Sequence, residues 1–382
     1  MTTRHHHRGR RGERGQLIVI AALSLVAIVG GVSLVIEGGN AYAQQRVVQN
    51  AADAVANGGA TVLAERLGGA IRSDADVHAK MATLANANRL DDFTAYYTTV
   101  DGALLNAAGN PVGAVGAAAR VGGGVIPPTS QGVRIAGNRE FPTTFARVLG
   151  FNEFTAGADA TAVTGALTGG LFMPVVFPVS MQDCDGTGTL VSNLDAPWRL
   201  SNPGATKGDH PIGQEFLVPL CKTGSGSFMV LDLDPDKDCF DEVFDPDPVQ
   251  FNNFPVDVAT DTGNDCAKKV QDGVNASDLQ GQVVLIPICD AECSTSGGTN
   301  GTYHIIRIAA FYLDYISYEN GGSNPACELI ESPTYGTSLV NIVGGNGSSS
   351  CMAGWFVRYV TSGPVGSGQI NNGEAIGIQL VR

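Results

Sequence analysis

The sequence has few basic residues: 23 Lys and Arg stand against 37 Asp and Glu, which gives a net charge of −14. The first fourteen residues hold five arginines and one acid, so they carry 5 − 1 = +4 and the rest carries −14 − 4 = −18. Phosphates repel so acidic a chain, and we therefore expect no nucleic-acid partner. Low charge combined with 50 glycines favours β-structure and turns over helices stabilised by salt bridges.

The sequence also lacks the residue patterns of common catalytic sites. The stretch at 222–227 lacks the Gly-Lys-Ser/Thr order of a phosphate-binding loop, and no Gly-x-Ser-x-Gly nucleophile motif is present. Asp261-Thr262-Gly263 matches an aspartic-protease triplet, but that chemistry needs two carboxylates that share a proton, and the chain has no second triplet. We therefore expect a protein that is not an enzyme.

Cysteine is absent before residue 184, and eight cysteines follow. An even number of cysteines in an exported domain predicts up to four disulfides. A zinc site is the alternative, because Cys289-x-x-x-Cys293 has a tolerable ligand spacing, but no second close pair follows and histidine is scarce. The disulfide candidates are Cys184, Cys221, Cys239, Cys266, Cys289, Cys293, Cys327 and Cys351.

One uncharged stretch, LIVIAALSLVAIVGGVSLVI at 17–36, dominates the N-terminal region. As a helix it would be roughly 30 Å long, the thickness of a bilayer's hydrocarbon core. Its basic flank predicts a cytoplasmic tail at 1–15, a single transmembrane helix at 16–37 and export of all that follows. A cleaved signal peptide is the alternative, with a cleavage site at Ala41-Tyr42-Ala43. The length of the run favours an uncleaved signal-anchor in the cell membrane.

Helical periodicity continues beyond this run. Small and β-branched residues recur in steps of four and three, as on one face of a helix. We predict one helix from the membrane to about residue 67, with a weak point at Gly58-Gly59, and a second helix at 74–90. The two form a helical stalk at 38–90.

The face with small residues has two interpretations. Another helix could approach it closely, because small side chains let two backbones come together. Packing of the same face on the protein's own next domain is an equal alternative. The helix-contact candidates are Ala27, Gly31, Val48, Ala52 and Val55.

The rest of the chain reads as β-rich. A small α+β unit is expected at 91–170, and an exported, disulfide-rich and sandwich-like β-domain at 171–382. In the first we predict strands at 93–100, 132–136 and 154–163, a short helix at 143–149 and a loop at 106–128. In the second we predict strands at 173–180, 215–220, 227–233, 283–288, 303–318, 354–361 and 375–382. The fold class is therefore α+β.

An acidic run and a set of aromatic residues are candidate binding features. Alternating carboxylates can converge on Ca²⁺, and the candidates are Asp232, Asp234, Asp236 and Asp238. Cys239 stands where an EF-hand loop requires glycine, so that loop is excluded, and a solvated acidic turn is the alternative. The aromatic residues could stack on a glycan or belong to the core; they are Trp198, Trp355, Tyr312, Tyr315 and Tyr318.

The N-terminal third resembles the TadG-like proteins of Flp (tight-adherence) pilus assembly. The resemblance rests on Arg14-Gly15-Gln16 before the apolar helix, on Glu37-Gly38-Gly39-Asn40-Ala41-Tyr42, a turn in that family, and on Gln49-Asn50-Ala51-Ala52-Asp53-Ala54. Val55 and Asn57 depart mildly from the pattern. The Asp-x-Ser-x-Ser metal motif of some relatives is missing, so their metal-dependent adhesion does not carry over.

The resemblance implies a membrane-anchored accessory protein of Flp/Tad pilus assembly or related secretion, with pilus-platform or pilin-like proteins as partners. It also implies that the α+β unit at 91–170 is pilin-like. Ile20 stands where prepilin processing favours Glu, which indicates an uncleaved accessory protein rather than a filament subunit. The alternative is a membrane-tethered surface adhesin whose head binds cell-surface glycan or Ca²⁺. No other cofactor is expected.

Overall fold

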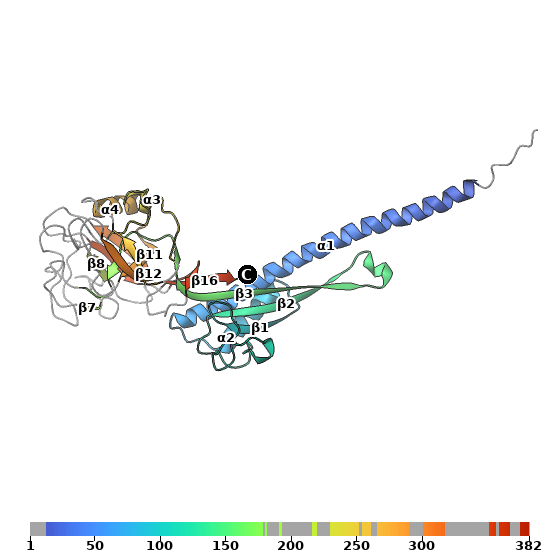
Figure 1. Ribbon diagram of the computed structural model, residues 1–382, viewed down its shortest axis with the longest axis horizontal. Helices are drawn as coiled ribbons and strands as arrows, with labels where there is room; N and C mark the ends of the chain where they lie inside the picture. Colours follow the sequence, from blue (N-terminus) through green and yellow to red (C-terminus); the bar gives the residue numbers. More distant parts are fainter. Residues whose placement is uncertain are drawn as a thin grey trace, which may run out of the picture.

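The N-terminal region is a single helix, α1 (Glu13–Leu67), of 55 residues. In the computed structural model its N-terminal part projects alone from the rest of the protein (Figure 1). The structure describes residues 13–178, 180–181, 191–192, 216–219, 230–251, 254–260, 266–289, 301–317, 351–356, 359–366 and 375–381. The predicted single helix is thus confirmed, and residues 37–42, a turn in the TadG-like pattern, are helical here.

The predicted weak point at Gly58-Gly59 does not interrupt the helix. A Cβ on Gly59 would lie 2.8 Å from Val133 Cγ2 and 2.9 Å from Met81 Sδ. Glycine is therefore used here for close packing of α1 against the sheet and against α2 (Asp74–Ala87), not for bending. Helix α2 begins with a capping box, in which Ser73 and Asp76 exchange hydrogen bonds.

The first sheet has the strand order β1-β2-β3-β16-β14, with β15 paired to β3. Its strands are β1 (Asp92–Thr98), β2 (Gly132–Pro142), β3 (Glu153–Leu167), β14 (Tyr359–Ser362), β15 (Val365–Gly366) and β16 (Ala375–Val381). Only the β14–β16 pair is parallel. Helix α1 packs on β2, β3 and β16, and the shared core includes Val48, Val55, Met81, Tyr97 and Ile135.

The connections between β1, β2 and β3 are short or hydrogen-bonded to β1. The predicted helix at 143–149 is a 3₁₀ helix, η2 (Ala146–Leu149), at the turn of the β2–β3 hairpin. The predicted loop at 106–128 contains η1 (Val115–Ala117) and hydrogen-bonds to β1, where Tyr97 N donates to Ala119 O over 3.1 Å. These bonds cover part of the outer edge of the sheet.

The second large sheet has the order β5-β11-β12-β13-β8, with β10 paired to β12. Its strands are β5 (Phe177–Pro178), β8 (Phe216–Pro219), β10 (Val256–Ala259), β11 (Gln282–Cys289), β12 (Thr302–Ser317) and β13 (Cys351–Phe356). Two small pairs join β4 (Gly169–Gly170) to β9 (Val249–Gln250) and β6 (Ser180–Met181) to β7 (Val191–Ser192).

Two helices that were not predicted from the sequence cover one face of this sheet: α3 (Asp241–Phe244) and α4 (Cys266–Ala276). Their residues Val243, Val270 and Val274 share a core with β11 and β12. The other face packs on a core that includes Leu167 of β3 and Ala375 of β16, which joins the two sheets. The fold is mixed α+β, as predicted.

The last strand does not stay with the second sheet. Residues 375–381 form β16 between β3 and β14 in the first sheet. From the sequence, they were predicted to belong to the β-domain at 171–382. The chain therefore leaves the first sheet after β3, builds the second sheet, and returns to the first. The second sheet is an insertion between neighbouring strands of the first.

Candidate functional site

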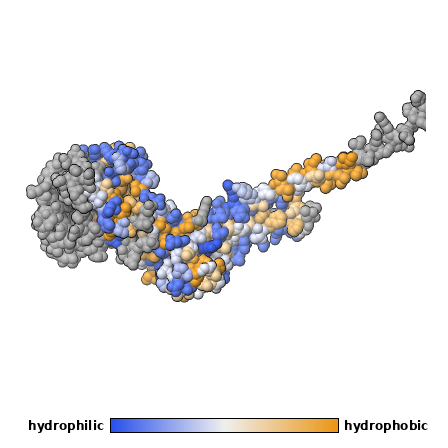
Figure 2. All heavy atoms as spheres, viewed as in Figure 1, coloured by the Kyte–Doolittle hydropathy of each residue, from blue (hydrophilic) through white to orange (hydrophobic). Residues whose placement is uncertain are grey.

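The N-terminal part of α1 is apolar and exposed. Side chains from Ile18 to Ile36 are largely uncovered, with 76% of Leu34 and 74% of Val35 exposed. This helix is long and apolar enough to span a membrane. Figure 2 shows the run as a continuous hydrophobic band. Gly31 lies on it, and a Cβ added there would meet nothing within 4 Å.

The helix-contact candidates divide between two environments. Val48, Ala52 and Val55 are fully buried in the core of the first unit. For these three, packing on the protein's own domain is therefore what the structure shows, and they are closed to a partner helix. Ala27 and Gly31 are exposed, so they remain candidates for a contact within a membrane.

Glu37 lies at the boundary between the exposed, apolar half of α1 and the half that packs in the core of the first unit. It follows directly on the apolar run, yet it is only 8% exposed. Its carboxylate accepts hydrogen bonds from Thr144 N at 3.1 and 3.2 Å and from Phe145 N at 3.2 Å. These amides precede η2, where a negative charge is favourable because the free N–H groups of a helix start point at it. Sequence reasoning named Glu37 only as part of a family pattern.

Two glutamines continue this contact along α1. Gln45 Nε2 donates to Gly157 O at 2.7 Å, and Gln49 Nε2 donates to Asp159 O at 3.2 Å. Together with Glu37 they bind α1 to the β2–β3 hairpin over roughly three turns of helix. The hairpin therefore runs along α1 to the end of the apolar segment (Figure 1).

A buried acid fixes the other end of the first unit. Asp74 is 5% exposed and accepts hydrogen bonds from Tyr97 Oη at 2.6 Å, Gly122 N at 2.9 Å and Gly124 N at 2.7 Å. Burial, and then the neighbouring Asp74 carboxylate, raise the pKa of Tyr97 far above its ordinary value. This group joins α2, β1 and the loop after β1, and all of its contacts are structural.

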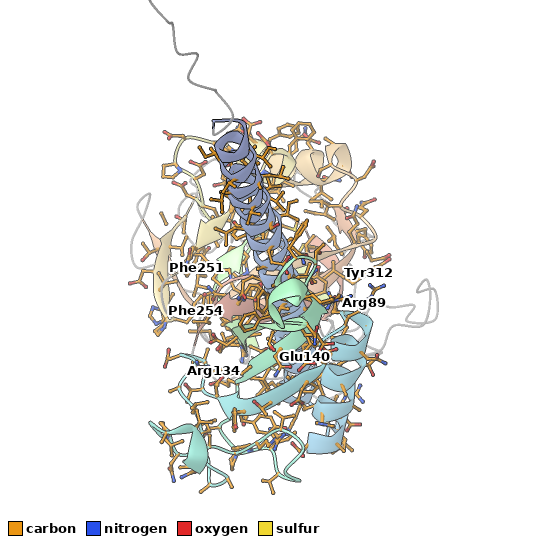
Figure 3. The ribbon with its side chains drawn as sticks, turned by 90° about the vertical axis from the view of Figure 1, so that its right-hand side faces the viewer. Arg89, Arg134, Glu140, Phe251, Phe254 and Tyr312 are labelled. Carbon is orange, nitrogen blue, oxygen red and sulfur yellow. A yellow bond between two sulfur atoms is a disulfide. The ribbon has the colours of Figure 1, made fainter. Side chains whose placement is uncertain are left out.

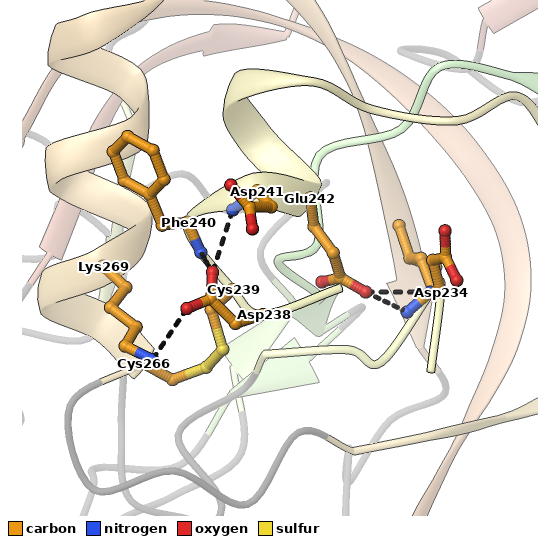
Figure 4. The surroundings of a disulfide bond; sticks show 9 residues. Asp234, Asp238, Cys239, Phe240, Asp241, Glu242, Cys266 and Lys269 are labelled. Atoms are coloured by element: carbon orange, nitrogen blue, oxygen red, sulfur yellow. Dashed lines mark hydrogen bonds and ion pairs between the residues drawn. A yellow bond between two sulfur atoms is a disulfide. The ribbon is translucent and has the colours of Figure 1, made fainter. Parts of the chain in front are cut away.

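The four carboxylates of the acidic run have separate surroundings. Asp238 Oδ1 accepts from Phe240 N and Asp241 N, both at 3.0 Å, at the start of α3, and its Oδ2 lies 3.0 Å from Lys269 Nζ (Figure 4). Asp234 Oδ1 accepts from Asp236 N at 3.1 Å. Asp232 is half-buried and its amide donates to Ala259 O, whereas Asp236 is exposed.

Lysines and a buried glutamate organise this turn. Lys237 Nζ lies 2.8 Å from Asp247 Oδ2, which raises the pKa of the lysine and lowers that of the aspartate. Glu242 Oε1 accepts from Leu233 N and Asp234 N. Across the described ranges, no group of three or more His, Cys, Asp or Glu side chains could hold a metal ion. The run is an acidic turn that caps α3, and the structure does not bring the Ca²⁺ candidates together.

One of the expected disulfides is described in full. Cys239 and Cys266 are bonded, with 5.6 Å between their Cα atoms and a sequence separation of 27 (Figure 4). The bond joins the segment before α3 to the first residue of α4. Cys289 is also disulfide-bonded. Cys184, Cys221, Cys293 and Cys327 lie outside the described residues, and Cys351 is described only by its backbone in β13.

The aromatic candidates that the structure describes face inward. Tyr312 and Tyr315 are partly buried and pack against the core that joins the two sheets. Trp198, Tyr318 and the triplet at 261–263 lie outside the described residues, and only the backbone of Trp355 in β13 is described. His304 pairs with Asp257 at 2.8 Å on the surface, across the β10–β12 ladder.

A cavity of about 680 Å³ lies where α3 approaches the β3–β5 connection. Its walls are mainly apolar and include Leu167, Phe172, Phe244, Leu285 and Tyr359. Glu242 also lines it, with Oε1 engaged by the turn before α3. Among the described residues the lining holds no paired acid and base and no nucleophile with a base. Comparisons of the chain with family models, with curated proteins and with solved structures found no match.

Proposed function

We propose that this chain is a single-pass, membrane-anchored protein without enzymatic activity, an accessory component of Flp/Tad pilus assembly or related secretion. Its partners are the bilayer and platform or pilin-like proteins. The observation that carries the proposal is α1, one uninterrupted helix whose first half is exposed and apolar and whose second half is the core of a folded unit. Such a helix couples a head to a membrane without a hinge.

Two features support an orientation with the head outside the cytoplasm. The arginine-rich N-terminus favours the cytoplasmic side. The Cys239–Cys266 disulfide lies in the second sheet's domain, and disulfides persist in oxidising compartments outside the cytoplasm. Both support a folded head on the extracytoplasmic side.

The adhesin alternative has weaker support. Of its Ca²⁺ candidates, Asp238 is engaged by the amide of Asp241 and by Lys269, and Tyr312 and Tyr315 pack against the core rather than forming an exposed stacking surface. The geometry agrees better with a scaffold role than with the adhesin alternative, because α1 connects the membrane rigidly to the head.

Co-purification of the full-length chain from its own membranes tests the partner. Gly31→Leu adds a side chain to the small-residue face of α1 that lies beyond the head, while the head should be unaffected because nothing lies near Gly31. We expect loss of pilus-platform or pilin-like proteins from the purified material. Val29→Leu is the matched control, since two residues turn the position about 200° around the helix. Equal recovery of partners with both variants would contradict the proposal.

A further inference from the structure

The β2–β3 hairpin ends in an exposed apolar tip. Residues 141–154, here called the hairpin tip, contain Phe151, which is 59% exposed, and Phe154, which is 36% exposed. Their ring centroids are 6.4 Å apart, and Phe154 also contacts the buried Phe141 at 6.2 Å. Phe151 is therefore exposed and contacts Phe154, which in turn packs on the core residue Phe141.

Glu37 fixes the position of the hairpin tip along the axis of α1. The residue before it, Ile36, is the last of the uncharged run, and the amides of Thr144 and Phe145 lie on the Glu37 carboxylate. The hairpin tip is thus held beside the turn of α1 where the apolar run ends. If the run spans the hydrocarbon core, this turn lies at the headgroup boundary.

Several backbone amides of the hairpin tip are paired within the protein. Thr143 N donates to Asn152 O at 3.0 Å, Phe151 N to Ala146 O at 3.1 Å, and the two Glu37-bound amides are paired. Contact with lipid requires this, because unpaired backbone groups are costly away from water. The exposed charges at the tip are Arg147 and Glu153, which offset one another.

We propose that the hairpin tip is a second membrane contact, with Phe151 seated in the interfacial layer of the leaflet next to the head. The occupant of this surface is lipid. The proposal rests on the proposed anchoring by α1 and extends it: two contacts, α1 and the hairpin tip, fix the tilt and rotation of the head, which one helix alone leaves free. Amphipathic segments seat their apolar side chains at a depth of roughly 5–10 Å in this boundary. Because the local charges offset, the contact is apolar and insensitive to salt.

Tryptophan quenching in vesicles tests the contact in the full-length protein. Single variants are reconstituted in phosphatidylcholine vesicles with lipids brominated near the carbonyl end of the acyl chain, and the wild-type signal from Trp198 and Trp355 is subtracted. We expect Phe151→Trp to be blue-shifted and quenched. Phe244→Trp is the matched control, because Phe244 is 51% exposed but lies on α3, and it should be unquenched.

A third variant separates this inference from the anchor itself. Leu25→Trp lies in the middle of the apolar run and reports insertion of α1 when lipids brominated deep in the acyl chain are used. Quenching of Leu25→Trp with no quenching of Phe151→Trp would overturn the hairpin contact and leave the anchor in place; a protein partner on the tip would give this result. No quenching of Leu25→Trp would overturn the proposed anchoring, and the second contact with it.

Discussion

Removing the charge of Glu37 should release the hairpin tip without unfolding the head. Glu37→Gln keeps one acceptor oxygen but turns an NH₂ group toward the amides of Thr144 and Phe145. Hydrogen bonds to charged groups contribute about 1.5–3 kcal/mol each. The distances of 3.1–3.2 Å are long for charge-assisted bonds, which favours the lower end. Solvent screening is small because the side chain is buried.

We therefore expect a loss of about 2 kcal/mol, which corresponds to roughly a thirtyfold rise in the opening of the tip. Amide hydrogen exchange of the full-length protein measures it, because local opening sets the exchange rate of each amide. Thr144 and Phe145 should lose protection, while amides of β1 should keep theirs. Glu140→Gln, on the same hairpin but exposed (Figure 3), should change nothing. Unchanged protection of both amides in Glu37→Gln would refute the role of the carboxylate.

Three further outcomes can be tested on the same protein. Cys239→Ser should lower the free energy of unfolding by about 2–4 kcal/mol in urea melts, because the unfolded chain is no longer closed into a loop between residues 27 positions apart. Equal stability would show that this loop is already constrained in the unfolded chain. Hydrogen bonds from the α3 backbone, and then from a lysine, hold the pKa of Asp238 below its ordinary value of 3.8. The contribution of the Asp238 carboxylate to the stability of the fold is complete above that value and is lost as the pH falls through the folded-state pKa. Asp238→Asn should therefore reduce the fall in Tm between about pH 5 and pH 2, by a small amount because the side chain is half exposed, whereas Asp236→Asn should match wild type. Gly59→Leu should destabilise the head by at least about 1–3 kcal/mol through overpacking, and Gly31→Leu should leave its Tm unchanged.

Local patterns predicted the first unit well. The apolar run and the small-residue face define α1, and in β2 the buried Val133 and Ile135 alternate with exposed neighbours, as expected for a strand with one covered face. A signal for α4 was also present, because Cys266, Val270 and Val274 recur at steps of four, but it is interrupted by lysines and by Gly273. The strand-rich composition around it favoured a β-only interpretation.

Long-range contacts could not be predicted in this way. The carboxylate of Glu37 meets amides 107 and 108 residues later in the chain, and no periodic pattern encodes that pairing. Lys269 reaches Asp238 across 31 residues, so this Ca²⁺ candidate forms an ion pair that its position in the sequence does not indicate. The place of β16 in the first sheet likewise depends on which sheet edge is open once β3 has formed.

The insertion of one sheet within another also sets the order of folding. Strand β3 is paired on one side by β2, which is close in sequence, but on the other side by β16, from the end of the chain. While residues 375–381 are still being synthesised or exported, that side of β3 is an open edge with unpaired amides and carbonyls, which invites wrong pairing. The first sheet can therefore be completed only after residues 375–381 have been made. A chain shortened before β16 would lose more than its tail, because it would leave the sheet beside α1 permanently open.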